Sequence, residues 1–216
     1  MRAILFDLDG TLVDSSEGIT KCAQYALAHY GIEETAPEKL YAFIGPPLQY
    51  TFEKLYGFSG ERADEAVVYY RERYNRDGIF ECSLYPHVAE CVQELRAQGY
   101  RVGVASSKPE LSCRRILEHF GVLELFDDVA GATFDRTIST KEEVLREVLR
   151  RWEDIPREEM CLVGDTIFDV EGAKCIGMPC VAVRFGFGNI EEMTAAGAVA
   201  VCGDLLELPG ILAKIS

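Results

Sequence analysis

Short apolar runs alternate with longer segments of helical periodicity through most of the chain. The apolar runs are rich in Val and Ile, and several end in Gly, Ser or Asp, which is typical of strands that end in a turn. The predicted strands are Ala3–Phe6, Arg101–Ala105, Val129–Ala132, Met160–Val163, Cys180–Val183 and Ala198–Val201. Helices are predicted to begin near Pro86, Pro109, Ser139, Phe168, Ile190 and Leu205. This alternation predicts an α/β fold, with a parallel sheet between two layers of helices.

Residues 14–80 break this rhythm, because they carry helical signals and no convincing strand. The signals fall at Ser16–Tyr30, Glu38–Phe43, Pro47–Tyr56 and Gly60–Arg76. The segment Asp14-Ser15-Ser16-Glu17 predicts a capping box at the start of the first helix. A helical block inserted directly after the first strand cannot join the sheet. We therefore expect a Rossmann-like three-layer core, residues 1–13 and 81–216, and an α-helical cap domain, residues 14–80, over the end of the first strand.

Two aspartates follow the first predicted strand, in the sequence Asp7-Leu8-Asp9-Gly10-Thr11. Ligands of open α/β sheets bind at the carboxyl ends of the strands, where this segment lies. Two carboxylates this close raise each other's pKa unless a cation neutralises them or one takes a proton. A bare pair of this spacing is also typical of an acidic turn. The preceding strand and the following Gly-Thr favour a site for Mg²⁺, which prefers hard oxygen ligands.

Hydroxyl and lysine side chains fall near two further strand ends. Ser106 and Ser107 close the second core strand and suit a phosphate oxygen, although such a pair also serves as a simple helix cap. Ser139 and Glu142 predict a second capping box, which places Lys141 in the first turn of a helix. The helix dipole disfavours a cation there. Lys141 therefore either reaches an acidic cluster and a bound anion or is a solvated surface residue.

A second pair of carboxylates follows the predicted strand Met160–Val163. Asp165 comes directly after Gly164, and Asp169 lies four residues further on, just inside the next helix. With the first two aspartates they make four carboxylates at one edge of one sheet. Helix capping explains Asp165 alone but not the whole set. The cluster implies a divalent cation and a lysine, because uncompensated it would be strongly unfavourable.

The amino-acid composition restricts the classes of binding partner and the cellular compartment that we expect. The 216-residue chain has 22 basic and 36 acidic residues, so its net charge is −14. A surface of this charge repels polyanions, which argues against nucleic acid or an anionic membrane as a partner. No apolar run approaches a membrane span, and the eight cysteines form no C-x-x-C pair, so zinc and disulfides are not expected. We expect a cytoplasmic protein, either a monomer or a weak homodimer.

The order and placement of these motifs resemble the haloacid dehalogenase superfamily, in its branch with a helical C1-type cap after the first strand. The resemblance implies that Asp7 is the nucleophile and Asp9 the general acid/base. It implies that Ser106, with its neighbour Ser107, and Lys141 hold the phosphate.

The same resemblance implies a Mg²⁺ site. Its ligands would be Asp7, the backbone carbonyl of Asp9, and Asp165, with Asp169 supporting this shell. Related dehalogenases have a different residue where this chain has Asp9, because a leaving halide needs no proton. Asp9 therefore favours cleavage of a phosphorus–oxygen bond.

The turn Phe43-Ile44-Gly45-Pro46-Pro47-Leu48 lies inside the predicted cap. It is either a helix connector or a substrate-facing loop, in which Ile44, Gly45, Pro46 and Pro47 would contact the leaving group. This loop and Ser-Thr-Lys-Glu-Glu-Val look most similar to phosphoglycolate phosphatase-like proteins and bacterial 5′-nucleotidases. The resemblance implies a Mg²⁺-dependent phosphatase for small phosphate monoesters, of the phosphoglycolate or nucleoside 5′-monophosphate type, acting through an aspartyl-phosphate on Asp7. The alternatives are a phosphomutase similar to β-phosphoglucomutase and a catalytically silent binding protein.

Overall fold

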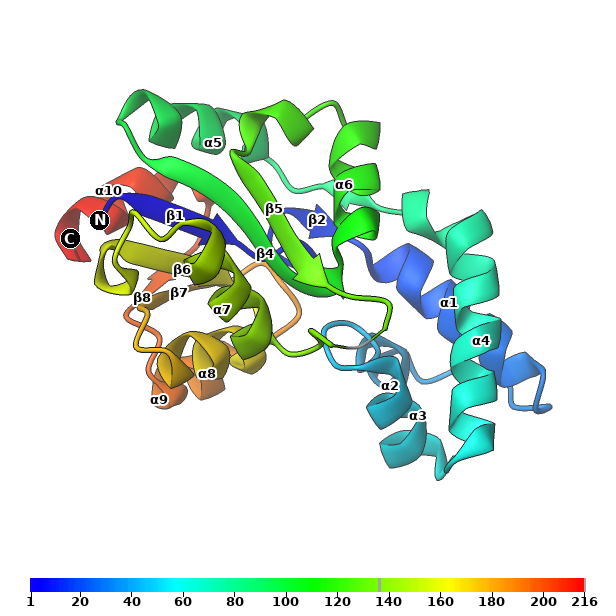
Figure 1. Ribbon diagram of the computed structural model, residues 1–216. Helices are drawn as coiled ribbons and strands as arrows, with labels where there is room; N and C mark the ends of the chain where they lie inside the picture. The colour runs from blue at the N-terminus through cyan, green and yellow to red at the C-terminus, as the bar shows by residue number, and fades with distance from the viewer. Residues whose placement is uncertain (136, 216) are drawn as a thin grey trace. The chain divides into compact units, whose positions relative to one another are not determined.

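The computed structural model describes residues 1–135 and 137–215 (Figure 1). They divide into two compact units, Met1–Val13 with Leu84–Ser216, and Asp14–Ser83. Two short strands, β2 (Val13–Asp14) and β3 (Ser83–Leu84), pair with each other where the chain passes between the units. In the described part of the chain, every helix is too short or too polar to span a bilayer.

The first unit is built on a six-stranded parallel sheet, as the alternation of strand and helix predicts. Its strand order is β5-β4-β1-β6-β7-β8. The strands are β1 (Ala3–Phe6), β4 (Arg101–Pro109), β5 (Asp128–Ala132), β6 (Met160–Gly164), β7 (Cys180–Val183) and β8 (Ala200–Cys202). The chain builds outward from β1 in one direction through β4 and β5 and then in the other through β6 to β8. The carboxyl end of β1 therefore lies at the point where the strand order reverses, which is the usual ligand site of such sheets.

Helices cover both faces of this sheet, so the predicted three-layer core is confirmed (Figure 1). They are α5 (Val88–Ala97), α6 (Glu110–His119), α7 (Lys141–Arg151), α8 (Ile167–Cys175), α9 (Ile190–Ala196) and α10 (Leu208–Ile215). The described residues also contain four short 3₁₀ segments along the chain: η1 (Gly78–Phe80), η2 (Leu123–Leu125), η3 (Arg157–Glu159) and η4 (Leu205–Glu207). On one face, side chains of α7, α8 and α9 form a continuous apolar core with alternate residues of the strands, such as Leu5 and Leu162. This alternation follows from the period of two along a strand.

The second unit consists of four helices, at the positions that the sequence predicts. They are α1 (Ser16–Ala28), α2 (Pro37–Tyr41), α3 (Leu48–Tyr56) and α4 (Glu61–Arg76). The ring of Phe52 forms a T-shaped pair with Phe43 and stacks parallel to Phe58, and all three rings are buried. Arg73 at the end of α4 makes two hydrogen bonds to the Glu81 carboxylate, at 2.7 and 3.0 Å. The Gly-Pro-Pro segment forms the turn between α2 and α3.

The predicted capping box at the start of α1 is wrong. The carboxylate of Asp14 accepts hydrogen bonds from the backbone N–H of Ser16 at 3.0 Å and from its hydroxyl at 2.6 Å. The reciprocal bond from Glu17 is not formed, because Glu17 pairs with Lys21 one turn further along the helix. A side chain thus satisfies one free donor of the helix, but by a shorter-range contact than a capping box.

The capping box of α7 lies one residue later than the sequence predicts. Thr140, not Ser139, accepts a hydrogen bond from the backbone N–H of Glu143, and Glu143 accepts one in return from the backbone of Thr140. Glu142 is free of this role because it forms an ion pair with Arg146. The shift leaves Lys141 in the first turn of the helix, as predicted.

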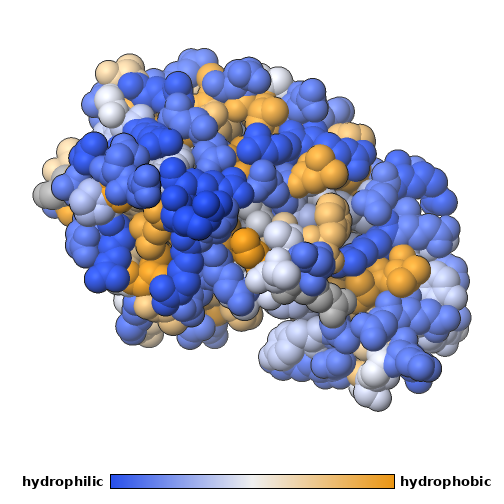
Figure 2. Space-filling view, viewed as in Figure 1, coloured by the Kyte–Doolittle hydropathy of each residue, from blue (hydrophilic) through white to orange (hydrophobic). Residues whose placement is uncertain are grey.

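The surface seen in Figure 2 is mostly hydrophilic, with hydrophobic residues in scattered patches. Six of the eight cysteines are buried: Cys22, Cys91, Cys113, Cys161, Cys180 and Cys202. They occupy interior positions in strands and helices, as small apolar residues do.

Candidate active site

The end of β1 brings Asp7 to the carboxyl edge of the sheet. The backbone N–H of Asp7 donates to the carbonyl of Val163 at 2.9 Å, which extends the ladder between β1 and β6 by one residue. The chain then turns at Gly10, whose φ of 81° lies in the left-handed region that favours glycine. A side chain at Gly10 would also collide with the carboxylate of Asp165. This glycine therefore allows the loop after β1 and the loop after β6 to approach closely.

Lys141 joins the two acidic motifs. Its Nζ lies 2.8 Å from Oδ1 of Asp7 and 2.8 Å from Oδ1 of Asp169, and it donates to the carbonyl of Ala105 at 2.7 Å. The lysine side chain is only 4% exposed. Burial alone would lower the pKa of Lys141, but Asp169 and Asp7 raise it above its ordinary value. Of the two interpretations of Lys141, the structure supports the buried partner of an acidic cluster.

Asp165 and Asp169 are held by different segments of the chain. The carboxylate of Asp165 accepts hydrogen bonds from the Thr11 hydroxyl at 3.3 Å and from the backbone N–H of Phe187 at 2.9 Å. The Oδ2 atom of Asp169 accepts two from Thr166, one from its backbone N–H and one from its hydroxyl. Both aspartates are fully buried. Each carboxylate is thus held in place by groups of the same unit.

The electrostatics of this cluster show a shortage of positive charge. Burial raises the pKa of Asp7 to about 6, although Lys141 acts in the opposite direction. Burial, together with Asp169 and Asp7, raises the pKa of Asp165 well above its ordinary value. One carboxylate oxygen from each of these three aspartates lies within 4.8 Å of the others. The set fits a metal ion, because a divalent cation would supply the missing charge to hard oxygen ligands.

Asp9 has a partner that the sequence motifs did not identify. Nζ of Lys108 lies 2.7 Å from both carboxylate oxygens of Asp9. The parallel register pairs Phe6 with Val104, so the residues after Phe6 and the residues after Val104 meet at the same edge. The signal that could have found Lys108 is this register, which places a cation beside the second aspartate.

The predicted phosphate-binding hydroxyls lie at the end of β4. Ser106 is buried, and its hydroxyl acts to lower the pKa of the Asp7 carboxyl, against the larger effect of burial. Ser107 comes next along the strand and is partly exposed. The structure thus brings Ser106 to the cluster of Asp7, Lys141 and Asp169, while a role for Ser107 stays a prediction.

The predicted substrate loop lies in the other unit, in the turn between α2 and α3. Ile44 is buried, whereas Gly45 and Pro47 are exposed and Pro46 is partly exposed. Contact of these residues with a substrate stays a prediction.

Comparisons with known proteins agree with this geometry. A family model described as haloacid dehalogenase-like hydrolase matches residues 4–183. A 5′-nucleotidase of Pseudomonas aeruginosa is 40% identical over 209 residues, which cover 97% of this chain and 94% of that protein. The tyrosine-protein kinase PtkA of Mycobacterium tuberculosis is 38% identical over 200 residues, 93% of this chain and 68% of the relative.

The fold has a close counterpart among solved structures. The crystal structure of a predicted phosphatase from Clostridium acetobutylicum is 37% identical and has a TM-score of 0.93, covering 99% of this chain and 98% of that one. The family model spans most of the chain and includes both acidic motifs. The chain therefore belongs to the haloacid dehalogenase-like hydrolase family.

Proposed function

We propose that this hydrolase is a phosphatase that cleaves small phosphate monoesters by way of a phosphoryl group carried on Asp7. The observation that carries the proposal is the contact of Lys141 with both Asp7 and Asp169. A buried ammonium group beside a carboxylate offsets charge repulsion between that carboxylate and an anionic ester. The 40% sequence identity to a 5′-nucleotidase supports the same class of reaction, hydrolysis of a phosphate monoester.

The chemistry divides between the two aspartates of the first motif. An oxygen of Asp7 attacks phosphorus, and the bond between phosphorus and the ester oxygen breaks. Asp9, which must enter this step in its protonated form, donates its proton to that oxygen as it leaves and becomes a carboxylate. Asp9 then takes a proton from a water molecule, whose oxygen attacks the phosphorus, so that inorganic phosphate leaves and Asp7 is restored. A positioned acid/base of this kind contributes about 10²–10⁴-fold to the rate.

Neighbouring groups hold the phosphoryl oxygens during both steps. We assign this role to Lys141 and to the hydroxyls of Ser106 and Ser107. Asp7, the backbone carbonyl of Asp9, and Asp165 would hold a divalent cation, which we propose to be Mg²⁺ and which supplies positive charge toward the phosphoryl group.

The supporting role proposed for Asp169 agrees with its contacts. One of its oxygens faces Lys141 and the other accepts hydrogen bonds from Thr166, so both are already engaged within the chain. Asp169 is thus better suited to orient Lys141 than to leave its present partners for an ion.

The helical segment 14–80 is proposed to act as the cap of this enzyme. Its turn from Ile44 to Pro47 would contact the leaving group and exclude water when the cap closes. A cap that supplies the leaving-group contacts would set the substrate. We propose nucleoside 5′-monophosphates or phosphoglycolate as the substrate type, in a cytoplasmic enzyme that is a monomer or a weak homodimer.

A panel of phosphate esters assayed with Mg²⁺ tests this function. The panel includes nucleoside monophosphates, phosphoglycolate, hexose phosphates, pyrophosphate, phosphotyrosine and ATP. Release of inorganic phosphate from monoesters, abolished in Asp7→Asn, is the expected result. Conversion of a hexose phosphate to its isomer without phosphate release would instead show a phosphomutase. No turnover of any member would show a silent binding protein.

A further inference from the structure

We propose that Lys108 is a positioning residue for proton transfer, because it holds the carboxylate of Asp9 in the orientation that the leaving group requires. The inference rests on the proposed function, which gives Asp9 the acid/base role. It adds a residue outside the acidic motifs and assigns different roles to the two lysines of the site.

The contact between Lys108 and Asp9 fixes the carboxylate as a whole. Nζ of Lys108 lies 2.7 Å from Oδ1 and 2.7 Å from Oδ2, so the ammonium sits on the axis of the carboxylate. The two side chains are 8% and 13% exposed. A pair removed from water to this extent is weakly screened, and losing one partner leaves a poorly solvated charge. Rotation of the Asp9 carboxylate away from this position is therefore unfavourable.

Two hydrogen bonds and one close backbone approach restrain the backbone of Lys108. Its N–H donates to Oγ of Ser106 at 3.3 Å, and its carbonyl accepts a hydrogen bond from Sγ of Cys113 at 3.6 Å. Gly131 of β5 lies so close that a Cβ there would be 2.6 Å from the same carbonyl. The ammonium thus extends from a rigid strand end, as a positioning group requires.

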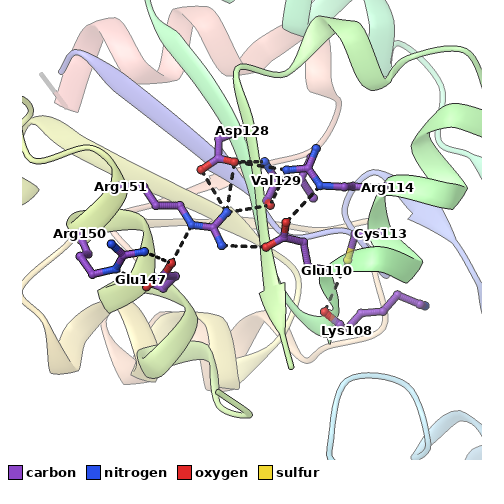
Figure 3. A network of polar contacts seen from close by, with 9 residues as sticks. All are labelled: Lys108, Glu110, Cys113, Arg114, Asp128, Val129, Glu147, Arg150 and Arg151. Carbon is purple, nitrogen blue, oxygen red and sulfur yellow. Dashed lines mark hydrogen bonds and ion pairs between the residues drawn. The ribbon is translucent and has the colours of Figure 1, made fainter. Parts of the chain in front are cut away.

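The chain just beyond Lys108 is anchored as well. Glu110, the first residue of α6, pairs with Arg151 of α7 at 2.8 Å and with Arg114 at 3.1 Å (Figure 3). Arg151 also reaches Asp128 at the start of β5. These ion pairs tie the segment after Lys108 to the neighbouring strand and helix.

The two lysines of the site face different aspartates. Lys141 contacts Asp7, the proposed nucleophile, and Lys108 contacts Asp9, the proposed acid/base. Loss of Lys108 should therefore damage proton donation and leave the attack by Asp7 largely intact. Proton donation matters most for esters whose leaving oxygen is strongly basic, because such an oxygen departs slowly without a proton.

The test is kcat/KM for Lys108→Met across aryl and alkyl phosphates with Mg²⁺. This parameter covers the steps up to departure of the leaving group and excludes the later hydrolysis. We expect a loss of about 100-fold for alkyl phosphates and a loss of less than about threefold for p-nitrophenyl phosphate, whose leaving group needs no proton. Lys214→Met removes one charge from the exposed end of α10 and should leave both values unchanged.

Two further variants separate this inference from the proposed function. Asp9→Asn should show the same dependence on the leaving group, and Lys108→Met should cost little more in that background. Lys108→Arg, which keeps a cation that can bond both carboxylate oxygens, should restore much of the alkyl phosphate activity. Equal losses on both ester types in Lys108→Met, with Asp9→Asn still selective, would overturn the role of Lys108 alone. A flat loss in Asp9→Asn would overturn both assignments.

Discussion

Two charged clusters of the same unit differ in how their charges balance. The candidate site contains four carboxylates, from Asp7, Asp9, Asp165 and Asp169, and two ammonium groups, from Lys108 and Lys141. The network of ion pairs in Figure 3 joins three arginines, Arg114, Arg150 and Arg151, to three carboxylates, Glu110, Asp128 and Glu147. Lys108 enters that figure only through its backbone carbonyl and belongs to the candidate site. The first therefore has a surplus of two negative charges, and the second is neutral.

The pKa values follow this difference. In the site, burial raises the pKa of Asp7 to about 6 and that of Asp165 well above the ordinary value. In the network, hydrogen bonds from Arg150 and Arg151 lower the pKa of Glu147 to about 2. A balanced network satisfies its own charges and stabilises the fold. A buried excess of charge of one sign instead indicates a site where a ligand of opposite charge binds and neutralises it.

Removing one cation from each cluster should give the largest contrast. Lys141→Met leaves Asp7 and Asp169 without their shared partner, so we expect a loss of about 3–5 kcal/mol in the free energy of unfolding and loss of phosphatase activity. Arg151 lies in a cluster that is more exposed to solvent. Arg151→Met should therefore lower the free energy of unfolding by about 1 kcal/mol and leave the activity unchanged. Urea unfolding and phosphate release measure the two effects. Similar losses of activity in both variants would contradict the distinction between a catalytic site and a purely structural ion-pair network.

The dependence of stability on pH should have opposite signs in the two clusters. Because folding raises the pKa of Asp7 from 3.8 to about 6, its stabilising contribution is complete below about pH 4 and is lost as the pH rises through about 6. The change amounts to about 3 kcal/mol in the absence of divalent cations. Unfolding of the wild type and Asp7→Asn in chelator between about pH 4 and 7 measures it. The variant should lack most of this decline, and parallel curves would contradict the raised pKa.

A divalent cation should stabilise the site and leave the network unaffected. At about 100 times its dissociation constant, Mg²⁺ is expected to raise the free energy of unfolding by about 2.7 kcal/mol. Asp165→Asn should abolish this gain, whereas Glu110→Gln in the network should keep it. Thermal unfolding with and without Mg²⁺ provides the comparison. Full stabilisation of Asp165→Asn would place the ion elsewhere.

The smallest effect is expected within the balanced network. Glu147→Gln removes a carboxylate that contacts Arg150 and Arg151, at a cost of about 1 kcal/mol near neutral pH. Because folding lowers the pKa of Glu147 from 4.5 to about 2, this contribution is present above about pH 4.5 and is lost as the pH falls through about 2. Chemical unfolding at neutral and acidic pH follows the difference. A cost that grows toward acidic pH would contradict the lowered pKa.

The sequence predicted most of the sheet and the acidic cluster for an identifiable reason. Val- and Ile-rich runs end in Asp or Ser, and the parallel topology then brings those ends to one edge, as it does for Asp7 and Asp165. Local patterns predicted less well where several residues compete for one contact. Ser139 and Thr140 are both good caps, and the difference between them depends on which glutamate is already paired.

Contacts set by register were harder to predict. Lys108 reaches Asp9 only because β4 pairs in register with β1, and the spacing of residues along the chain does not contain that information. The partners of Asp165 also come from distant segments, Thr11 and Phe187. Sequence motifs identified which residues carry charge, whereas tertiary structure determines which charge each one faces.

The most direct test of the central claim is chemical trapping of the phosphoryl group on Asp7. The chain is mixed with Mg²⁺ and a substrate from the ester panel, quenched in acid and treated with borohydride, which reduces an acyl phosphate to an alcohol. We predict that peptide mass spectrometry finds homoserine at position 7, and at none of the other aspartates of the site. Steady release of phosphate by the same preparation with Asp7 unmodified, and retained in Asp7→Asn, would contradict the account.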